Sequence, residues 1–295
     1  MDIEKYRALL CAVDNGSLSA AAEQLGYTPS GLSRMMLSLE KEHGFPLLLR
    51  GKDGVCPTAE CRRILPQIRE LIYQGEKLRQ LSESIRGLES GSLTIGTAYS
   101  AFYPWLSRVT EAFHRQHPGI DIRIVHGYSS DLAAQLAEHR LDVAFISRRE
   151  GRHDWLPLLE DPLVAMLPGD HALAAAKAVP VGCFAAEAYI NTYPGKDIDN
   201  ARVFARCGIA PNTQYSTTDI HATCAMVASG LGISMNNRIN CQGNMTGIAI
   251  RPLDPGQTVT IGMAITPDET PALRAFRSFA GSYLREITDR EGALC

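Results

Sequence analysis

The sequence lacks the features of an exported or membrane-spanning protein. Its first residues, MDIEKYRALL, are charged from the second position on, and no run of about 18 apolar residues occurs in the chain. We therefore expect a cytoplasmic protein with no membrane partner. With 295 residues, 45% of them apolar, the chain is long enough for two or three globular domains.

Motifs for metal binding, redox chemistry and catalysis are also missing. The eight cysteines form no C-x-x-C pair and match no zinc spacing, and the eight histidines are scattered. A redox switch using Cys207 and Cys224 is a weak alternative to cysteines that only fill the core. Neither G-x-G-x-x-G nor G-x-S-x-G occurs, and nothing brings Ser, His and Asp together. The sequence therefore predicts no metal, no cofactor, no catalytic residues and no enzymatic activity.

An excess of positive charge is absent too. The net charge is −3, and residues 1–90 contain 12 Lys or Arg against 12 Asp or Glu. Composition therefore gives no support for nucleic-acid binding, and such a function has to rest on motif and placement.

The N-terminal part contains a pattern of two short capped helices. Ser17 can cap a helix that ends at Gly26, and Thr28 can cap a second one with Pro29 at its first position. Two helices joined by a tight glycine turn are typical of a helix-turn-helix, although any helical hairpin shares these signals. The polar face of the second helix has side chains that can approach base edges and phosphates, namely Ser30, Ser33, Arg34 and Ser38.

The flanking segments extend this pattern. We expect a helix over residues 3–13 before it and a hairpin of strands 47–49 and 55–56 after it, with Arg50 and Lys52 at the hairpin tip. Such a wing could contact the phosphate backbone or the minor groove, and an ordinary exposed hairpin is the alternative.

A long helix is expected from Thr58 to about Arg86. Its apolar residues recur mostly every seven positions, as a coiled-coil-like seam: Ile64, Leu71, Leu78, Leu81, Ile85 and Leu88. We expect this seam to form a dimer, and packing on its own chain is the alternative. A dimer would let two modules bind two half-sites.

Four segments give these first 90 residues a resemblance to the DNA-binding module of LysR-type transcriptional regulators. They are GSLSAAAEQL (Gly16–Leu25), SGLSRMMLSLE (Ser30–Glu40), GFPLL (Gly44–Leu48) and VCPTAE (Val55–Glu60). The resemblance implies a winged helix-turn-helix that binds double-stranded DNA, with Ser17, Thr28, Ser30, Ser33, Arg34, Arg50 and Lys52 as candidate contacts. The chain departs from the family pattern at Pro29–Gly31, where Gln-Pro-Ala is common, beside the surface that would contact bases.

After Gly91 the pattern changes to strands alternating with helices, which indicates an α/β fold with a parallel sheet. We expect two α/β lobes, with the chain crossing between them near Glu160 and again near Thr266. Residues LDVAF (Leu141–Phe145) and VASGLGI (Val227–Ile233) resemble the effector-binding domain of the same family, which is similar in fold to bacterial solute-binding proteins.

The expected organisation follows from these two resemblances. Residues 1–57 form the winged helix-turn-helix, residues 58–88 the linker and dimerisation helix, and residues 89–295 the effector-binding domain. Lobe I comprises residues 89–160 and 267–295, and lobe II comprises residues 161–266.

Polar residues at strand ends predict where an effector binds. In open α/β sheets, ligands bind beyond the carboxyl ends of strands, and by family resemblance these loops line the effector pocket. Arg148 could pair with a carboxylate, and aromatic rings could stack on an aromatic acid. Thr218 precedes a helix whose N-terminal amides could hold an anion. Helix caps and loop hydrogen bonds are the alternative roles for the candidate residues, which are Tyr99, Ser100, His126, Ser129, Ser147, Arg148, Thr192, Tyr193 and Thr218.

The sequence thus predicts a homodimeric or homotetrameric transcriptional regulator that binds DNA under the control of a small organic effector. RNA polymerase is a further candidate partner. The rival hypotheses are a cytosolic small-molecule-binding protein or enzyme whose helical N-terminus only serves oligomerisation, and a stand-alone solute-binding protein, which would need an export signal.

Overall fold

The structure, a computed structural model, describes residues 2–51, 54–86, 90–241 and 245–290. It forms two compact units. The first contains residues 1–89 together with residues 138–140, and the second contains residues 90–137 and 141–295. No helix in the described ranges is both long enough and apolar enough to cross a bilayer.

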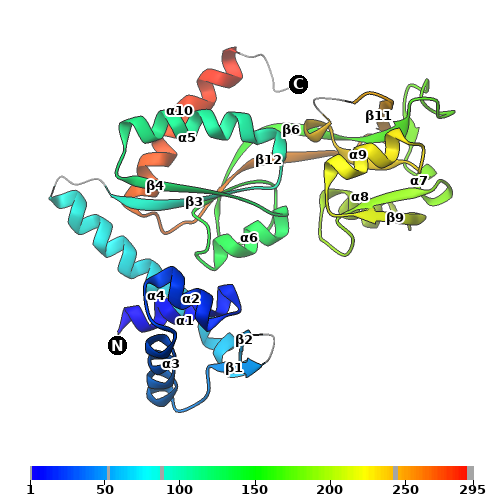
Figure 1. The fold of residues 1–295 in the computed structure, drawn as a ribbon. Coiled ribbons are helices and arrows are strands. Elements are labelled where there is room, and N and C mark those ends of the chain that lie inside the picture. The colour runs from blue at the N-terminus through cyan, green and yellow to red at the C-terminus, as the bar shows by residue number, and fades with distance from the viewer. Residues whose placement is uncertain (1, 52–53, 87–89, 242–244, 291–295) are drawn as a thin grey trace. The chain divides into compact units, whose positions relative to one another are not determined.

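The first unit is a winged helix-turn-helix followed by a long helix (Figure 1). The predicted caps are in place: hydroxyl oxygens of Ser17, Thr28 and Thr58 accept hydrogen bonds from backbone amides three residues ahead, at 3.2, 3.1 and 3.0 Å. Each cap satisfies a first-turn donor that has no partner inside its helix. The elements are α1 (Ile3–Asn15), α2 (Leu18–Leu25), α3 (Pro29–His43), β1 (Leu48–Gly51), β2 (Gly54–Pro57) and α4 (Ala59–Ile85).

The core of this unit comes from the apolar faces that the sequence indicated. Leu9 of α1, Ala21 of α2 and Leu32 of α3 are fully buried in one cluster. Gly26 and Gly44 end α2 and α3 with left-handed backbone at φ 71° and 79°, a conformation that glycine adopts without steric cost.

The apolar seam of α4 has two different halves. Ile64 and Leu71 pack against the core of the first unit. Leu78, Leu81 and Ile85 are instead 65%, 50% and 79% exposed. Leu88 lies outside the described residues. The first half of the seam therefore packs on its own chain. The second half is exposed, and dimerisation through it stays a prediction.

The second unit is built on a sheet with the strand order β4-β3-β5-β12-β6-β11-β7, and β10 also pairs with β6. The β3–β4 and β3–β5 pairs are parallel, as predicted, whereas β12 is antiparallel to both β5 and β6. The strands of this sheet are β3 (Gly91–Thr97), β4 (Ile120–His126), β5 (Val143–Ser147), β6 (Asp154–Pro168), β7 (Val179–Pro180), β10 (Ser234–Asn237), β11 (Ile248–Asp254) and β12 (Thr258–Ile265).

Lobe I of this unit has helices on both faces of the sheet. In Figure 1, α5 (Tyr103–Gln116) and α10 (Pro271–Arg290) lie on one face and α6 (Ser129–Ala137) on the other. Separate buried clusters fill the two interfaces. Trp105 and Phe276 belong to the first cluster, and Leu132 and Leu136 to the second.

Lobe II contains the far half of β6 and a second, two-stranded parallel sheet, β8–β9. Its helices pack on these strands, with Phe204 of α8 and Val227 of α9 in two buried clusters. The remaining elements are β8 (Tyr189–Thr192), β9 (Thr213–Thr217), α7 (Cys183–Ala186), α8 (Asp199–Cys207), α9 (Ile220–Ala228) and two short 3₁₀ turns, Ser100–Phe102 and Arg238–Asn240.

The predicted boundary between the lobes is wrong at its second crossing. Residues Ile261–Ile265 of β12 pair with β5, which places this strand in lobe I. The chain therefore returns to lobe I near residues 258–260, where β12 pairs with residues 160–162 of β6, and not near Thr266. The sequence analysis also missed β11 and the first half of β6, in which Pro252, Pro157 and Pro162 weaken the strand signal.

Candidate functional site

The exposed face of α3 is the candidate DNA-binding surface. Ser30, Arg34 and Leu37 follow one another at i, i+4 and i+7, so they lie along one stripe of the helix, and all three are exposed. Leu37 is 56% exposed, so its apolar side chain is available for contact on this face. The sequence analysis missed Leu37 and named Ser38 instead, whose hydroxyl accepts a hydrogen bond from Lys5 Nζ at 2.9 Å.

The wing is connected to this surface through Arg50. Its Nη1 atom donates to Ser33 Oγ of α3 at 2.9 Å, so an exposed guanidinium of β1 lies beside the exposed stripe. Lys52, the other predicted residue of the wing tip, lies outside the described residues.

The two remaining predicted DNA contacts have structural partners. Ser17 caps α2 and Thr28 caps α3, and Thr28 Oγ1 lies 3.3 Å from Ser30 Oγ. These hydroxyls fix where the helices begin. Tyr27, in the turn between α2 and α3, is 38% exposed and was not predicted.

A cavity of about 300 Å³ lies between the two lobes of the second unit. Loops after β3, β4 and β8, the first turns of α6, α8 and α9, and the end of β10 line it. Seven of the nine predicted effector residues are brought together here: Tyr99, Ser100, His126, Ser129, Thr192, Tyr193 and Thr218. Contact of these residues with an effector remains a prediction.

The sequence analysis missed residues of this cavity that come mainly from helix starts and from β10. Tyr103, Tyr128 and His221 add aromatic rings, and Asn200, Asn236 and Asn237 add amides. Tyr128 of lobe I meets Tyr193 of lobe II edge-to-face, with ring centroids 4.9 Å apart.

Asp199 at the start of α8 is the centre of a buried network that joins the two lobes. Its carboxylate accepts hydrogen bonds from Tyr99 Oη at 2.8 Å, Ser147 Oγ at 2.6 Å and Arg149 Nη2 at 3.0 Å. All three donors come from lobe I. Asp199 and Arg149 are only 6% and 7% exposed, so each charge depends on the other for compensation. Burial and the Asp199 charge raise the pKa of Tyr99, so this phenol stays protonated and remains a donor.

Ser147 and Arg148 do not line the cavity. Ser147 is 1% exposed and serves the Asp199 network. Arg148 is exposed and borders a neighbouring surface hollow with Asp197 and Arg202. Arg149, one residue further, has its guanidinium buried between the lobes, because consecutive residues of an extended segment point in opposite directions.

The prediction of an anion site at the start of α9 is wrong. Asp219 occupies the position before this helix, and its Oδ1 accepts hydrogen bonds from the amides of His221 at 2.6 Å and Ala222 at 3.2 Å. A carboxylate of the protein itself therefore satisfies the donors that an anion would use.

Two titratable rings of the cavity, His126 and Tyr193, have pKa values shifted towards their neutral forms. Burial lowers the pKa of His126, against a smaller opposing effect of the Asp219 charge. Burial also raises the pKa of Tyr193, as does the charge of Asp219. Near neutral pH these groups present uncharged aromatic faces and polar edges to the cavity.

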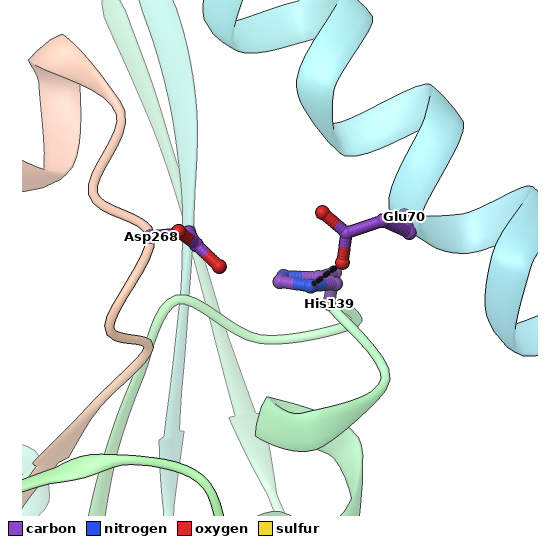
Figure 2. Close-up of side chains that lie close together, drawn as sticks. All are labelled: Glu70, His139 and Asp268. Carbon is purple, nitrogen blue, oxygen red and sulfur yellow. Dashed lines mark hydrogen bonds and ion pairs between the residues drawn. The ribbon is translucent and has the colours of Figure 1, made fainter.

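Three side chains of metal-ligand type, Glu70, His139 and Asp268, are shown in Figure 2. Glu70 of α4 and His139 belong to the first unit, where His139 Nε2 lies 2.7 Å from Glu70 Oε2 and the imidazole stacks on Tyr73. Asp268 belongs to the second unit. Within the described residues, neither unit alone brings together three ligands of this kind.

Both parts of the chain match family models. Residues 3–62 match the model described as bacterial regulatory helix-turn-helix protein, lysR family, and residues 86–285 match the LysR substrate binding domain. The Hca operon transcriptional activator HcaR of Escherichia coli (strain K12) is 26% identical over 98% of this chain and 100% of its own length.

Solved structures with the same fold include regulators of this kind. Full-length OxyR from Pseudomonas aeruginosa has a TM-score of 0.72 at 22% identity, covering 97% of this chain and 95% of that one. Full-length CbnR complexed with its target DNA has a TM-score of 0.61 at 19% identity, covering 96% and 99%.

Proposed function

The chain belongs to the LysR family of bacterial transcriptional regulators, and from that premise we propose that it recognises one operator sequence through the Ser30–Arg34–Leu37 stripe of α3 and the β1–β2 wing. It is a DNA-binding transcriptional regulator with an effector-binding domain, and it is not an enzyme. A protein that acts on chromosomal DNA works in the cytoplasm, which supports the location expected from the sequence.

The observation that supports this proposal best is the chemistry of the exposed α3 stripe. Arg34 can donate two parallel hydrogen bonds to a guanine edge, Ser30 can bond to a base or a phosphate, and Leu37 can contact a thymine methyl group. The hydrogen bond of 2.9 Å from Arg50 Nη1 to Ser33 Oγ supports a further contact, in which Arg50 would bind the phosphate backbone beside a groove occupied by α3.

Self-association is the second part of the proposal. Leu78, Leu81 and Ile85 form an uncovered apolar strip on the last turns of α4. A second α4 would bury this strip as a coiled-coil seam, and the resulting dimer would bind two half-sites. A dimer bound at a promoter would act on RNA polymerase.

Effector binding is the third part. The cavity between the lobes is lined by hydroxyl, amide and aromatic groups from both lobes, so a small molecule bound there would contact both and favour one arrangement of the lobes. The lining supports an aromatic or polar ligand. The sequence analysis predicted an effector with a carboxylate group. That prediction loses its main support, because Arg148 lies outside the cavity and Asp219 accepts hydrogen bonds from the α9 amides.

Selection of bound duplexes from a random DNA library tests the proposal. Full-length protein should enrich one sequence that contains two related half-sites about one helical turn apart. Enrichment of a single half-site would refute the dimer but not the recognition surface. Failure to enrich any sequence over repeated rounds at moderate salt would refute the proposal.

A further inference from the structure

We propose that the cavity between the lobes binds an organic cation, with an ammonium or quaternary ammonium group held between its aromatic rings and the carboxylate of Asp219. This inference rests on the proposed function and specifies its effector by chemical class. It replaces the organic acid that the sequence predicted.

The charges around the cavity support a cation. The lining contains two carboxylates, Asp199 and Asp219, and its residues include neither lysine nor arginine. Arg149 neutralises Asp199 from the lobe I side at 3.0 Å. Asp219 has no arginine or lysine partner among the described residues, and only its Oδ1 atom is used, by the first amides of α9. The cavity lining therefore contains one solvent-exposed carboxylate that caps α9 and forms no ion pair with a described side chain.

The same charge disfavours an organic acid. A carboxylate ligand in this cavity would face Asp219 without a guanidinium or ammonium group to offset the repulsion. Partial burial lowers the pKa of His126, so its imidazole is a weaker source of positive charge than a guanidinium or ammonium group.

Besides the Asp219 carboxylate, the cavity contains aromatic rings that can bind a cation. Tyr103, His126 and Tyr128 come from lobe I, and Tyr193 comes from lobe II. The negative faces of such rings attract cations, and several rings together recognise ammonium groups that cannot form strong hydrogen bonds. The Tyr128 ring already attracts one cation of the protein, since Lys196 Nζ lies 5.5 Å from its centroid, although Lys196 is not among the residues that line the cavity.

The proposed cation site contains groups from both lobes, which connects ligand binding to regulation. Asp219 and Tyr193 belong to lobe II, whereas Tyr103 and His126 belong to lobe I. A cation between them would attract groups of both lobes and stabilise the closed arrangement that the Asp199 network already supports.

Calorimetric titration of the full-length protein with choline tests the inference. The comparison ligand is the uncharged alcohol in which carbon replaces the choline nitrogen, and benzoate represents an organic acid. Choline should bind at least about tenfold more tightly than its isostere, because only choline gains the cation–π and Asp219 interactions. Equal affinities, or binding of benzoate without binding of choline, would overturn the inference.

Matched variants locate the binding. Asp219→Asn keeps a side chain that caps helices well and removes the charge, so the fold is retained while choline affinity falls about tenfold. Tyr103→Leu should weaken choline severalfold without changing affinity for the uncharged isostere. Asp170→Asn removes an exposed carboxylate outside the cavity and should change nothing. An unchanged choline affinity in Asp219→Asn would refute the site.

Operator binding measured with the same protein preparations distinguishes failure of the cation inference from failure of the proposed function. If wild-type protein binds its selected operator but does not bind choline, the cation inference fails and the proposed function stands. If it binds choline but enriches no DNA sequence, the proposed function fails and the cation inference stands.

Discussion

At the scale of single residues, the pair of Arg149 and Asp199 shows what the sequence could and could not predict. The sequence analysis expected Arg148, after β5, to bind an effector between the lobes, but Arg148 lies outside the cavity and Arg149 is the arginine buried between the lobes. The sequence could not distinguish Arg149 from Arg148, because the choice depends on Asp199, which is fifty residues away in the chain and close only after both lobes have folded.

Breaking this buried pair should destabilise the second unit strongly. In Asp199→Ala, the Arg149 guanidinium loses its counter-ion while remaining buried, and Tyr99 and Ser147 lose their acceptor. We expect a loss of about 3 kcal/mol or more in urea unfolding. Glu111→Ala is the matched control. It breaks an ion pair with Arg115 in which both side chains are exposed, Glu111 by 62% and Arg115 by 73%, and should cost less than about 1 kcal/mol. Equal losses would contradict the assigned role of the network.

Asp161, on β6 where the chain passes between the lobes, should make stability depend on pH. Burial raises its pKa to about 6, and the charge of Asp199 acts in the same direction. The folded protein therefore retains a proton that the unfolded chain releases near pH 4. The stabilisation is complete below about pH 4 and is lost as pH rises through about 6.

Asp161→Asn tests this pH dependence, because its amide oxygen can still accept from the Ile239 amide while the charge is removed. The variant should be more stable than wild type above pH 6, by about 1–2 kcal/mol, and the difference should shrink towards pH 4. Urea unfolding midpoints between pH 4 and pH 8 give the measurement. A constant difference over that range would contradict the assignment.

At the scale of helices and strands, local signals were sufficient in the first unit and insufficient in the second. Ser17, Thr28 and Thr58 cap the predicted helices, because a cap bonds to amides only three residues away. By contrast, β12 was assigned to the wrong lobe, since its pairing with β5 joins residues more than a hundred positions apart. Sheet partners depend on the assembled fold, which a single strand does not encode.

The last turns of α4 should determine the oligomeric state. Leu78→Asp places a charge within the exposed apolar strip, so dimers should dissociate at concentrations at least about a hundredfold higher than for wild type. Ser84→Asp puts the same charge on an exposed position of the same helix that is not part of the seam. Sedimentation equilibrium distinguishes the two variants. Dissociation of both to the same extent would indicate that charge and not the strip controls association.

At the scale of the whole molecule, the neutral charge of the N-terminal region makes specific contacts more important than electrostatic attraction. Residues 1–90 have equal numbers of acidic and basic side chains, so non-specific affinity for DNA should be weak. Discrimination between operator and random DNA is then expected to depend on the exposed side chains of α3. Helix periodicity predicted the exposed positions of Ser30 and Arg34 and missed Leu37, and contact of these residues with bases stays a prediction.

The most direct test of the central claim compares the affinity of the full-length protein for its selected operator with its affinity for a scrambled duplex. Both affinities are measured across a salt series for wild type, Arg34→Ala and Arg63→Ala. Arg63 is an exposed arginine of α4 and serves as the matched control. Arg34→Ala should weaken operator binding by about 1–3 kcal/mol with little change for scrambled DNA, whereas Arg63→Ala should match wild type. Equal losses on both duplexes, or none with Arg34→Ala, would contradict recognition of the operator through α3.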